Sequence, residues 1–291
     1  MKRILLPFVV SLIMVSLISS CGNGPVQGLY PKGKETVRIV TYNVGVFGKW
    51  DLSSEHYTAS IMQELAPNVI ALQELDSCTT RSGIERYQAK EFAGAMGEDW
   101  DYFYASALIP YKKGTYGIGM AWDRSKHTVV RNFKVKIPRV KASENRALAV
   151  VEYEDMVVAS THLNGNAEDV MPSVELINDT LKALYGQSEK PVFLCGDFNA
   201  KPENPAMVFL REHWTILTPE GATGVGGKNR GVTPAPQHIQ EVKGNCIDYI
   251  MLLKNDAKIT LLDSKICFRF ENGSAFESSD HLPVFVDVLL E

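Results

Sequence analysis

The chain has 291 residues, 45% of them hydrophobic, and a formal net charge of -4 at neutral pH. That length and hydrophobic fraction indicate one large domain with a substantial core. The sequence has no low-complexity run and no change of composition that would mark a second domain. The acidic balance argues against nucleic-acid affinity built on many phosphate contacts, although a bound divalent cation would still attract one phosphate.

The N-terminal residues have the pattern of a secretory signal. Lys2 and Arg3 precede an apolar run, and two small residues stand directly before Cys21. The run is shorter than the roughly 20 residues that a membrane-spanning helix needs. The sequence therefore predicts a lipoprotein signal peptide over residues 1–20, lipidation of Cys21 and export to the periplasmic or cell-surface side of a bacterial membrane. An ordinary signal peptide followed by a coincidental cysteine is the alternative.

The first half of the chain alternates predicted strands and helices. The Gly and Pro content of residues 21–34 predicts a tether, which leaves residues 35–291 for the domain. A serine cap at position 53 or 54 begins a helix that ends at Pro67. The remaining patterns predict strands over 37–46, 68–75, 102–107, 117–122 and 127–137, and a helix over 84–96.

The second half begins with a predicted hairpin and returns to strand–helix–strand order. The hairpin strands cover 147–151 and 157–161, and a helix follows over 169–185. Further strands are predicted over 191–194, 214–217, 247–253, 258–267 and 284–290. Residues 219–244 are rich in Gly and Pro without periodicity, and we interpret them as a loop that faces the substrate. These elements predict an α/β fold of two mixed sheets packed face to face, with helices outside.

Four cysteines follow Cys21, namely Cys78, Cys195, Cys246 and Cys267. Their spacing suits neither a zinc site nor a dense disulfide framework. A disulfide is compatible with an exported protein, but small buried apolar side chains are the favoured interpretation.

Acidic, amide and imidazole side chains stand where several apolar runs end. Strand ends in α/β chains face the crevice where ligands bind, so such residues favour a site over a scaffold. The collection predicts a metal-assisted phosphoester hydrolase. Its members are Asn43, Glu74, His162, Asp197, Asn199, Asp248, Asp280 and His281.

Each of these groups suits one step of phosphoester cleavage. Glu74, assisted by Asn43, offers hard oxygen ligands for Mg²⁺, with Mn²⁺ as the other candidate. Asp197 and Asn199 can hold and activate the attacking water. The remaining groups act on the phosphate: His281 donates to a phosphoryl oxygen with Asp248 as its carboxylate partner, and His162 is a second proton donor or phosphate ligand.

Each residue also has a structural alternative. A glutamate at a strand end can be a solvated terminus, a single histidine can be a satisfied core residue, and Asp197-Phe198-Asn199 can be a plain turn. The joint occurrence of these groups in one order favours the catalytic interpretation.

In that order, the segments resemble the endonuclease/exonuclease/phosphatase superfamily. The most specific pieces are Gly-Asp-Phe-Asn-Ala over 196–200 and Ser-Asp-His-Leu-Pro over 279–283, and the likeness covers nearly all of the mature chain. The resemblance implies a four-layered α/β/β/α sandwich of the deoxyribonuclease I type, with its site at the top of the two sheets. A resemblance to exported members fits the predicted signal.

The resemblance also implies roles for the matching positions. It places Asn43, Glu74 and Asp280 near the metal, Tyr116 and Arg146 near the phosphate, His162 as an acid or phosphate ligand, Asp197 and Asn199 at the nucleophile, and Asp248 beside His281. One departure is Asn164, since many relatives carry an acidic residue soon after the central histidine. An alternative for Arg146 is a surface ion pair with Glu144 or Glu152.

Three functional classes stay open. The leading one is a monomeric Mg²⁺-dependent phosphodiesterase or phosphatase outside the cytoplasm, acting on nucleic acid, a phosphorylated small molecule or a lipid head group. We rank a general phosphoesterase above a nuclease and a nuclease above a sphingomyelinase-like enzyme, although a lipid anchor would favour a substrate in the membrane. The third class, a binding module that has lost catalysis, conflicts with the intact set of acidic and imidazole groups.

Overall fold

The computed structural model describes residues 28–229 and 242–291 of the chain. The predicted signal peptide and Cys21 lie outside the described residues, as do positions 230–241 of the predicted loop. Within the described part, none of the helices has the length and apolar character required to cross a membrane.

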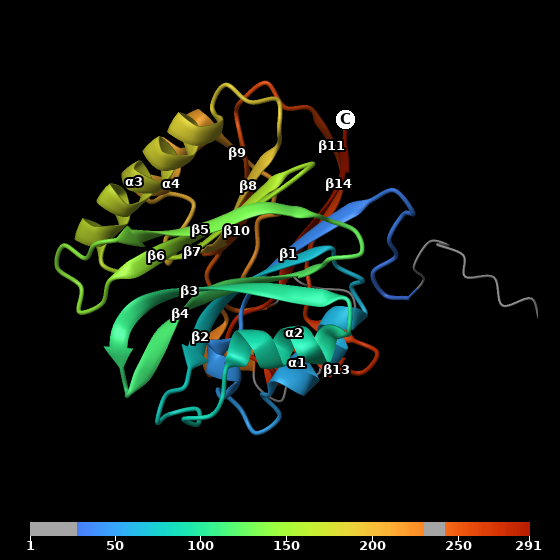
Figure 1. Ribbon diagram of the computed structural model, residues 1–291, viewed down its shortest axis with the longest axis vertical. Helices are drawn as coiled ribbons and strands as arrows, with labels where there is room; N and C mark the ends of the chain where they lie inside the picture. Colours follow the sequence, from blue (N-terminus) through green and yellow to red (C-terminus); the bar gives the residue numbers. More distant parts are fainter. Residues whose placement is uncertain (1–27, 230–241) are drawn as a thin grey trace, which may run out of the picture.

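A six-stranded mixed sheet forms one half of the fold (Figure 1). Its strand order is β11-β14-β1-β2-β4-β3, in which β1 and β2 are parallel and every other neighbouring pair is antiparallel. The parallel pair brings the ends of β1 and β2 to the same edge of the sheet. The strands are β1 (Val37–Asn43), β2 (Val69–Ser77), β3 (Trp100–Tyr111), β4 (Gly114–Asp123), β11 (Ile259–Ile266) and β14 (Val284–Leu290).

A second six-stranded mixed sheet has the order β5-β6-β7-β8-β10-β9. Here β7 and β8 are the parallel pair, so their ends also meet at one edge. The strands are β5 (Val129–Ile137), β6 (Arg146–Tyr153), β7 (Val157–His162), β8 (Val192–Asp197), β9 (Trp214–Ile216) and β10 (Asp248–Leu253). A short separate hairpin consists of β12 (Arg269–Phe270) and β13 (Gly273–Ser274).

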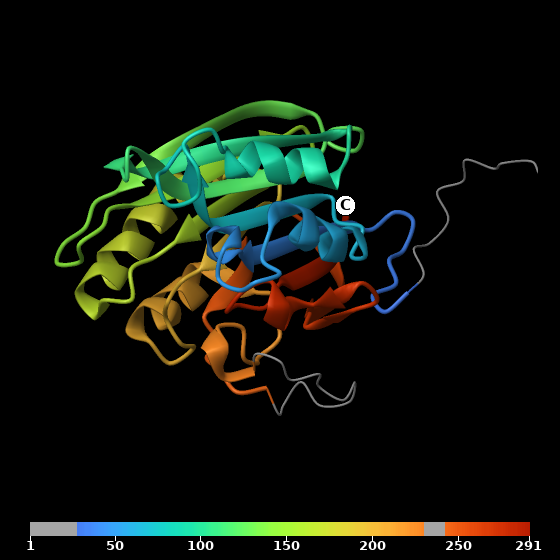
Figure 2. The same ribbon diagram turned by 90° about the horizontal axis from the view of Figure 1, so that it is seen from below.

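Helices cover the outer face of each sheet. Figure 2 shows α1 (Glu55–Gln63) and α2 (Gln88–Met96) side by side on the first sheet, whereas α3 (Ala167–Tyr185) and α4 (Pro205–His213) cover the second. The Ser54 hydroxyl caps α1 by accepting from the backbone N–H of Tyr57 at 3.1 Å. Among the described residues there are also three short 3₁₀ helices, namely η1 (Gly45–Phe47), η2 (Gly226–Asn229) and η4 (Ala275–Glu277).

Apolar packing defines the layers. Ile39, Met120 and Phe193 belong to a buried cluster between the two sheets, and a separate cluster lies under each pair of helices. This arrangement confirms the predicted four-layered α/β/β/α sandwich.

Several details of the prediction were wrong, among them the strand predicted over 37–46, which ends at Asn43. The helix predicted over 84–96 begins only at Gln88, because Arg81 and Ser82 bind the Asp76 carboxylate and hold the preceding residues in a loop. Helix α4 was not predicted; it begins with Asn204 as its cap and Pro205 in its first turn.

A buried arginine fixes the N-terminal stretch to the edge where β1 begins. Arg38 is fully buried and forms a two-bonded ion pair with Asp287, at 2.7 Å from Nε to Oδ1 and 2.6 Å from Nη2 to Oδ2. The same guanidinium donates to the carbonyl oxygens of Tyr30, Pro31 and Leu65. Residues 30 and 31 are therefore held at the start of β1, the end remote from Asn43.

Candidate active site

The predicted site residues meet where the strands of both sheets end. Asn43, His162 and Asp197 are the last residues of β1, β7 and β8, and Asp248 is the first of the antiparallel β10. In register, Asp197 lies opposite both His162 and Asp248. Glu74 lies at a β-bulge in β2 with a positive φ of 59°, which turns its side chain out of the regular alternation.

Asp197 is the centre of this arrangement and is only 1% exposed. Its Oδ2 lies 3.1 Å from Nδ2 of Asn43, 3.5 Å from Nε2 of His162 and 3.6 Å from Nε2 of His281. Burial, followed by the charge of Asp248, raises the pKa of Asp197 to about 7. A carboxylate with that pKa can accept a proton near neutral pH.

His281 and Asp248 form a close pair, with 2.9 Å between Nδ1 and Oδ2. Burial opposes a charged ring, but Asp248 and Asp197 outweigh it and raise the pKa of His281 to about 10. The ring is therefore an imidazolium at pH 7, and its Nδ1–H donates to Asp248. This fixes the ring orientation and leaves Nε2–H directed to the side of Asp197.

His162 has the opposite protonation state. Burial, and then the charge of Arg146, hold its pKa well below the ordinary value, so the ring is neutral at pH 7. Asn199 Nδ2 lies 3.2 Å from its Nε2 and also donates to the carbonyl oxygen of Leu163. His162 thus offers a neutral imidazole beside the imidazolium of His281.

Arg146 and Tyr116 border the same site. The guanidinium lies 3.4 Å from Nδ1 of His162 and donates from Nε to Oδ1 of Asn164 at 2.8 Å. Burial and the charge of Glu144 and Glu74 raise the pKa of Tyr116 against the opposing effect of Arg146, which keeps the phenol protonated. The alternative for Arg146 was a surface ion pair. Arg146 does form an ion pair with Glu144, at 3.6 Å, but its guanidinium also contacts His162 and therefore lies at the site.

A lysine joins the two remaining acidic groups. Nζ of Lys49 lies 3.1 Å from Oδ2 of Asp280 and 3.7 Å from Oε2 of Glu74, while Nδ2 of Asn43 lies 3.2 Å from Oε1 of Glu74. Glu74 and Asp280 therefore converge on one cationic group, as expected for groups that share a metal. Neither Lys49 nor the contact of Asn164 with Arg146 was predicted from the sequence. The only available signal for Lys49 was a basic residue soon after the first strand.

In the part of the chain that the structure describes, two groups of site residues are candidates for holding a metal ion. Ligand atoms of Asp197, Asp248 and His281 lie within 4.8 Å of one another. The imidazolium of His281 already balances the charge of one of the two carboxylates in that cluster. Both ring nitrogens carry a proton, so a metal ion could bind the ring only after one of these protons leaves. The oxygen atoms of Glu74 and Asp280 converge on an ammonium group, and such hard ligands suit Mg²⁺. The residues present therefore fit a divalent cation best at Glu74 and Asp280.

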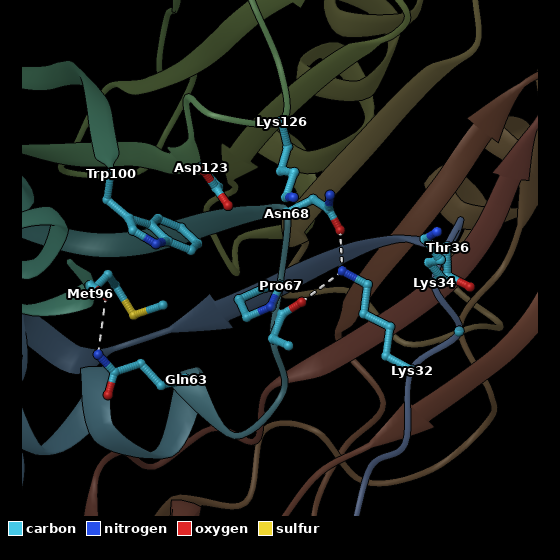
Figure 3. Close-up of a pocket in the computed structure, with 12 residues that line it drawn as sticks. Lys32, Lys34, Thr36, Gln63, Pro67, Asn68, Met96, Trp100, Asp123 and Lys126 are labelled. Atoms are coloured by element: carbon cyan, nitrogen blue, oxygen red, sulfur yellow. Dashed lines mark hydrogen bonds between the residues drawn. The ribbon is translucent and has the colours of Figure 1, made fainter. Parts of the chain in front are cut away.

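A separate cavity of about 320 Å³ lies near the start of β1 (Figure 3). Lys32 extends along its wall and donates to the carbonyl oxygen of Ala66 at 2.8 Å and to Oδ1 of Asn68. None of the predicted site residues lines this cavity, and it lies at the end of the sheet opposite Asn43. It is not the catalytic site.

A family model described as the endonuclease/exonuclease/phosphatase family matches residues 40–281. The chain belongs to this family. The match includes all ten predicted catalytic, metal and substrate residues, from Asn43 to His281, and excludes the predicted signal and tether. No curated protein matches the sequence.

Solved structures of other family proteins share this fold. An endonuclease/exonuclease/phosphatase from Bacteroides vulgatus aligns with a TM-score of 0.66 at 15% identity, over 88% of this chain and 99% of that one. A mannosyl-6-phosphatase from Bacteroides thetaiotaomicron gives 0.63 at 15% identity, over 87% and 100%. TDP2 from D. rerio, complexed with a single-strand DNA product, gives 0.63 at 15% identity, over 87% and 98%. At such identities these likenesses establish the fold of the family member described here.

Proposed function

We propose that this protein is a Mg²⁺-dependent phosphoester hydrolase that acts outside the cytoplasm, with Asp197 as the base that activates water. Membership of the family supports phosphoester hydrolysis. The observation that carries the proposed mechanism is the position of the buried Asp197 carboxylate between two imidazoles, 3.5 Å from Nε2 of His162 and 3.6 Å from Nε2 of His281. Burial raises its pKa to about 7, which suits a base near neutral pH.

The side chains divide the reaction among them. Asp197 accepts a proton from the attacking water, and Asn43 and Asn199 hold that carboxylate and its surroundings in place. The imidazolium of His281 donates to a phosphoryl oxygen, and Asp248 keeps the ring charged and oriented. Arg146 and Tyr116 bind the remaining phosphoryl oxygens. Neutral His162 contacts the phosphate, whose negative charge would raise the pKa of the ring and prepare it to donate a proton.

Glu74 and Asp280, assisted by Asn43, would hold the metal. When bound, Mg²⁺ would supply charge that polarises a phosphoryl oxygen or stabilises the leaving group. The convergence of both carboxylates on Lys49 supports this position, since both already contact a cationic group there. Mn²⁺ prefers similar oxygen ligands and is the alternative.

Lys49→Met is expected to bind Mg²⁺ about tenfold more tightly than the wild type, because the ammonium competes for the same carboxylate oxygens. Titration calorimetry measures this affinity without any substrate. Lys126→Met, which alters an exposed lysine at the Figure 3 cavity, is the matched control and should leave the affinity unchanged. Weaker Mg²⁺ binding by Lys49→Met would assign Lys49 a supporting role at the metal.

For the substrate we rank a general phosphoesterase first, a nuclease second and a lipid phosphodiesterase third, as the sequence indicates. The structures with this fold include a mannosyl-6-phosphatase and a protein complexed with a single-strand DNA product, so a test of function should compare several classes of substrate.

We also propose export and lipidation at Cys21, supported by Lys2, Arg3 and the apolar run. Mass spectrometry of the mature N-terminus tests this, and an unmodified Cys21 would exclude the anchor.

The experiment that tests the function is a substrate panel with Mg²⁺ and with Mn²⁺. It compares plasmid DNA, bis-p-nitrophenyl phosphate, sphingomyelin and inositol phosphates, with EDTA as the control for metal dependence. We expect hydrolysis of at least one class that EDTA abolishes. Hydrolysis unaffected by EDTA would exclude the metal from the proposed mechanism. If none of these substrates is hydrolysed, the result would favour a binding module that has lost catalysis.

A further inference from the structure

A groove at the open edge between the two sheets adjoins the residues around the predicted phosphate site. It has a volume of about 570 Å³ and lies between β3 and β5, which are edge strands of their respective sheets. Glu144 in its wall pairs with Arg146, and Tyr111 packs 5.5 Å from the ring of Tyr116. The groove therefore begins beside Arg146 and Tyr116, and its volume is typical of ligand sites.

The face that β5 presents to the other sheet carries lysines. Phe133 and Val135 pack toward the cluster beneath α3 and α4, so the alternation of a strand places Lys134 and Lys136 on the opposite face. Nζ of Lys134 confirms this direction, because it donates to Oγ of Ser106 on β3 at 2.6 Å. Inner faces of packed sheets are normally apolar. Lys134 and Lys136 therefore make this edge of the sandwich polar and positively charged.

Two cations of the groove have no acidic partner. Within residues 28–229 and 242–291, no carboxylate forms an ion pair with Lys136 or Arg139, although both line the groove and both are exposed. Arg139 instead donates to the carbonyl oxygen of Ser143 at 2.5 Å. The groove therefore has uncompensated positive charge in a protein that is acidic as a whole.

The facing wall is apolar and aromatic. Ile109 is 66% exposed, an unusual exposure for a large aliphatic side chain, and it is followed by Pro110 and Tyr111. One wall thus suits an anionic group and the other suits a ring or other apolar surface. A ligand that carries both would cover the apolar wall and neutralise the cationic one.

We propose that this groove binds a second phosphate of the substrate through Lys136 and Arg139, while the ring that joins the two phosphates lies against Ile109 and Tyr111. The inference rests on the proposed function, because the first phosphate is the one bound for hydrolysis beside Arg146. It narrows the substrate class to phosphoesters with two phosphates on one sugar or cyclitol ring, as in a nucleotide chain or an inositol bisphosphate.

Binding of matched ligands tests the groove without turnover. In EDTA, titration calorimetry compares thymidine 3′,5′-bisphosphate with thymidine 5′-monophosphate, and inositol 1,4-bisphosphate with inositol 1-phosphate. We expect the bisphosphate of at least one pair to bind about tenfold more tightly, and the pair that shows this identifies the ring. Equal affinities within both pairs would overturn the proposal.

Substitutions at Lys136 assign the preference to the groove. Lys136→Gln is expected to lower the preference about fivefold, Lys136→Arg to retain it, and Lys126→Gln, at the remote cavity, to leave it unchanged. A preference that survives Lys136→Gln together with Arg139→Gln would place the second phosphate elsewhere and refute the groove.

Failure of the groove and failure of the proposed function give different results. If the wild type hydrolyses the panel substrates but binds mono- and bisphosphates equally, the groove proposal is wrong and the hydrolase stands. If it hydrolyses none of them and still prefers bisphosphates through Lys136, the groove stands and the hydrolase proposal is wrong.

Discussion

Asp197→Asn is expected to lower kcat by about three orders of magnitude, because the amide has the size of the carboxylate but cannot accept a proton from water. The wild-type kcat/KM should rise as the pH increases through about 7, where Asp197 loses its proton, and fall below that pH. Steady-state kinetics with a chromogenic phosphodiester between pH 5 and 9 measure both quantities. Activity of the variant near the wild-type level would exclude Asp197 as the base.

Thermal unfolding separates this effect from a loss of fold. Burial raises the pKa of Asp197 above the value that the carboxyl group has in the unfolded chain. At pH values above that unfolded-state pKa, the buried charged carboxylate therefore destabilises the folded state. A neutral asparagine removes that penalty, and the Tm of the variant at pH 8 should equal or exceed that of the wild type. A large fall in Tm would mean that the amide disrupts the hydrogen bonds from Asn43 and Asn199.

His281→Ala and Asp248→Asn are each expected to lower kcat/KM about a hundredfold, and the double variant should lose little more than the worse single variant. The reason is that Asp248 acts through the ring: it keeps His281 charged and fixes its orientation across a 2.9 Å contact. Kinetics of the four proteins complete the double-mutant cycle. Losses that simply multiply would show that the two residues act independently.

A second carboxylate–imidazole pair provides the control for that cycle. Asp155 lies 3.0 Å from Nδ1 of His127, which in turn contacts Asn68 near the Figure 3 cavity. Asp155→Asn disturbs a similar contact outside the catalytic edge and should leave kcat/KM unchanged. A matching loss would mean that the Asp248 variant acts through general stability.

The sequence predicted the layers and most of the candidate site because both depend on regular elements. Buried strands that end in Asn43, His162 and Asp197 are visible as apolar runs, and parallel pairing necessarily brings such ends to one edge. The contact between Asp248 and His281, predicted from the residues and implied also by the family resemblance, is present. Chemistry carried at strand ends can thus be predicted from a single sequence when the strands are well marked.

The residues that were missed lie on irregular backbone. Lys49 follows η1, where Val46 has a positive φ of 55°, and Asn164 lies in the short connection before α3. No periodicity determines where such segments direct their side chains, so only the folded chain shows that Lys49 reaches Asp280. The groove was missed for a similar reason, since a bulge between Val129 and Arg131 sets which residues of β5 face inward.

The position of Arg38 has a consequence for where substrate can come from. Its guanidinium holds Tyr30 and Pro31 at one end of β1, while Asn43 lies at the other end, roughly 20 Å away at about 3.3 Å per residue. If acyl chains on Cys21 secure the enzyme to a bilayer, the linking chain would therefore enter the fold at the end opposite the catalytic edge. Cleavage of head groups in the same bilayer would then require the domain to reorient on its predicted tether, whereas soluble molecules would reach the site without that movement.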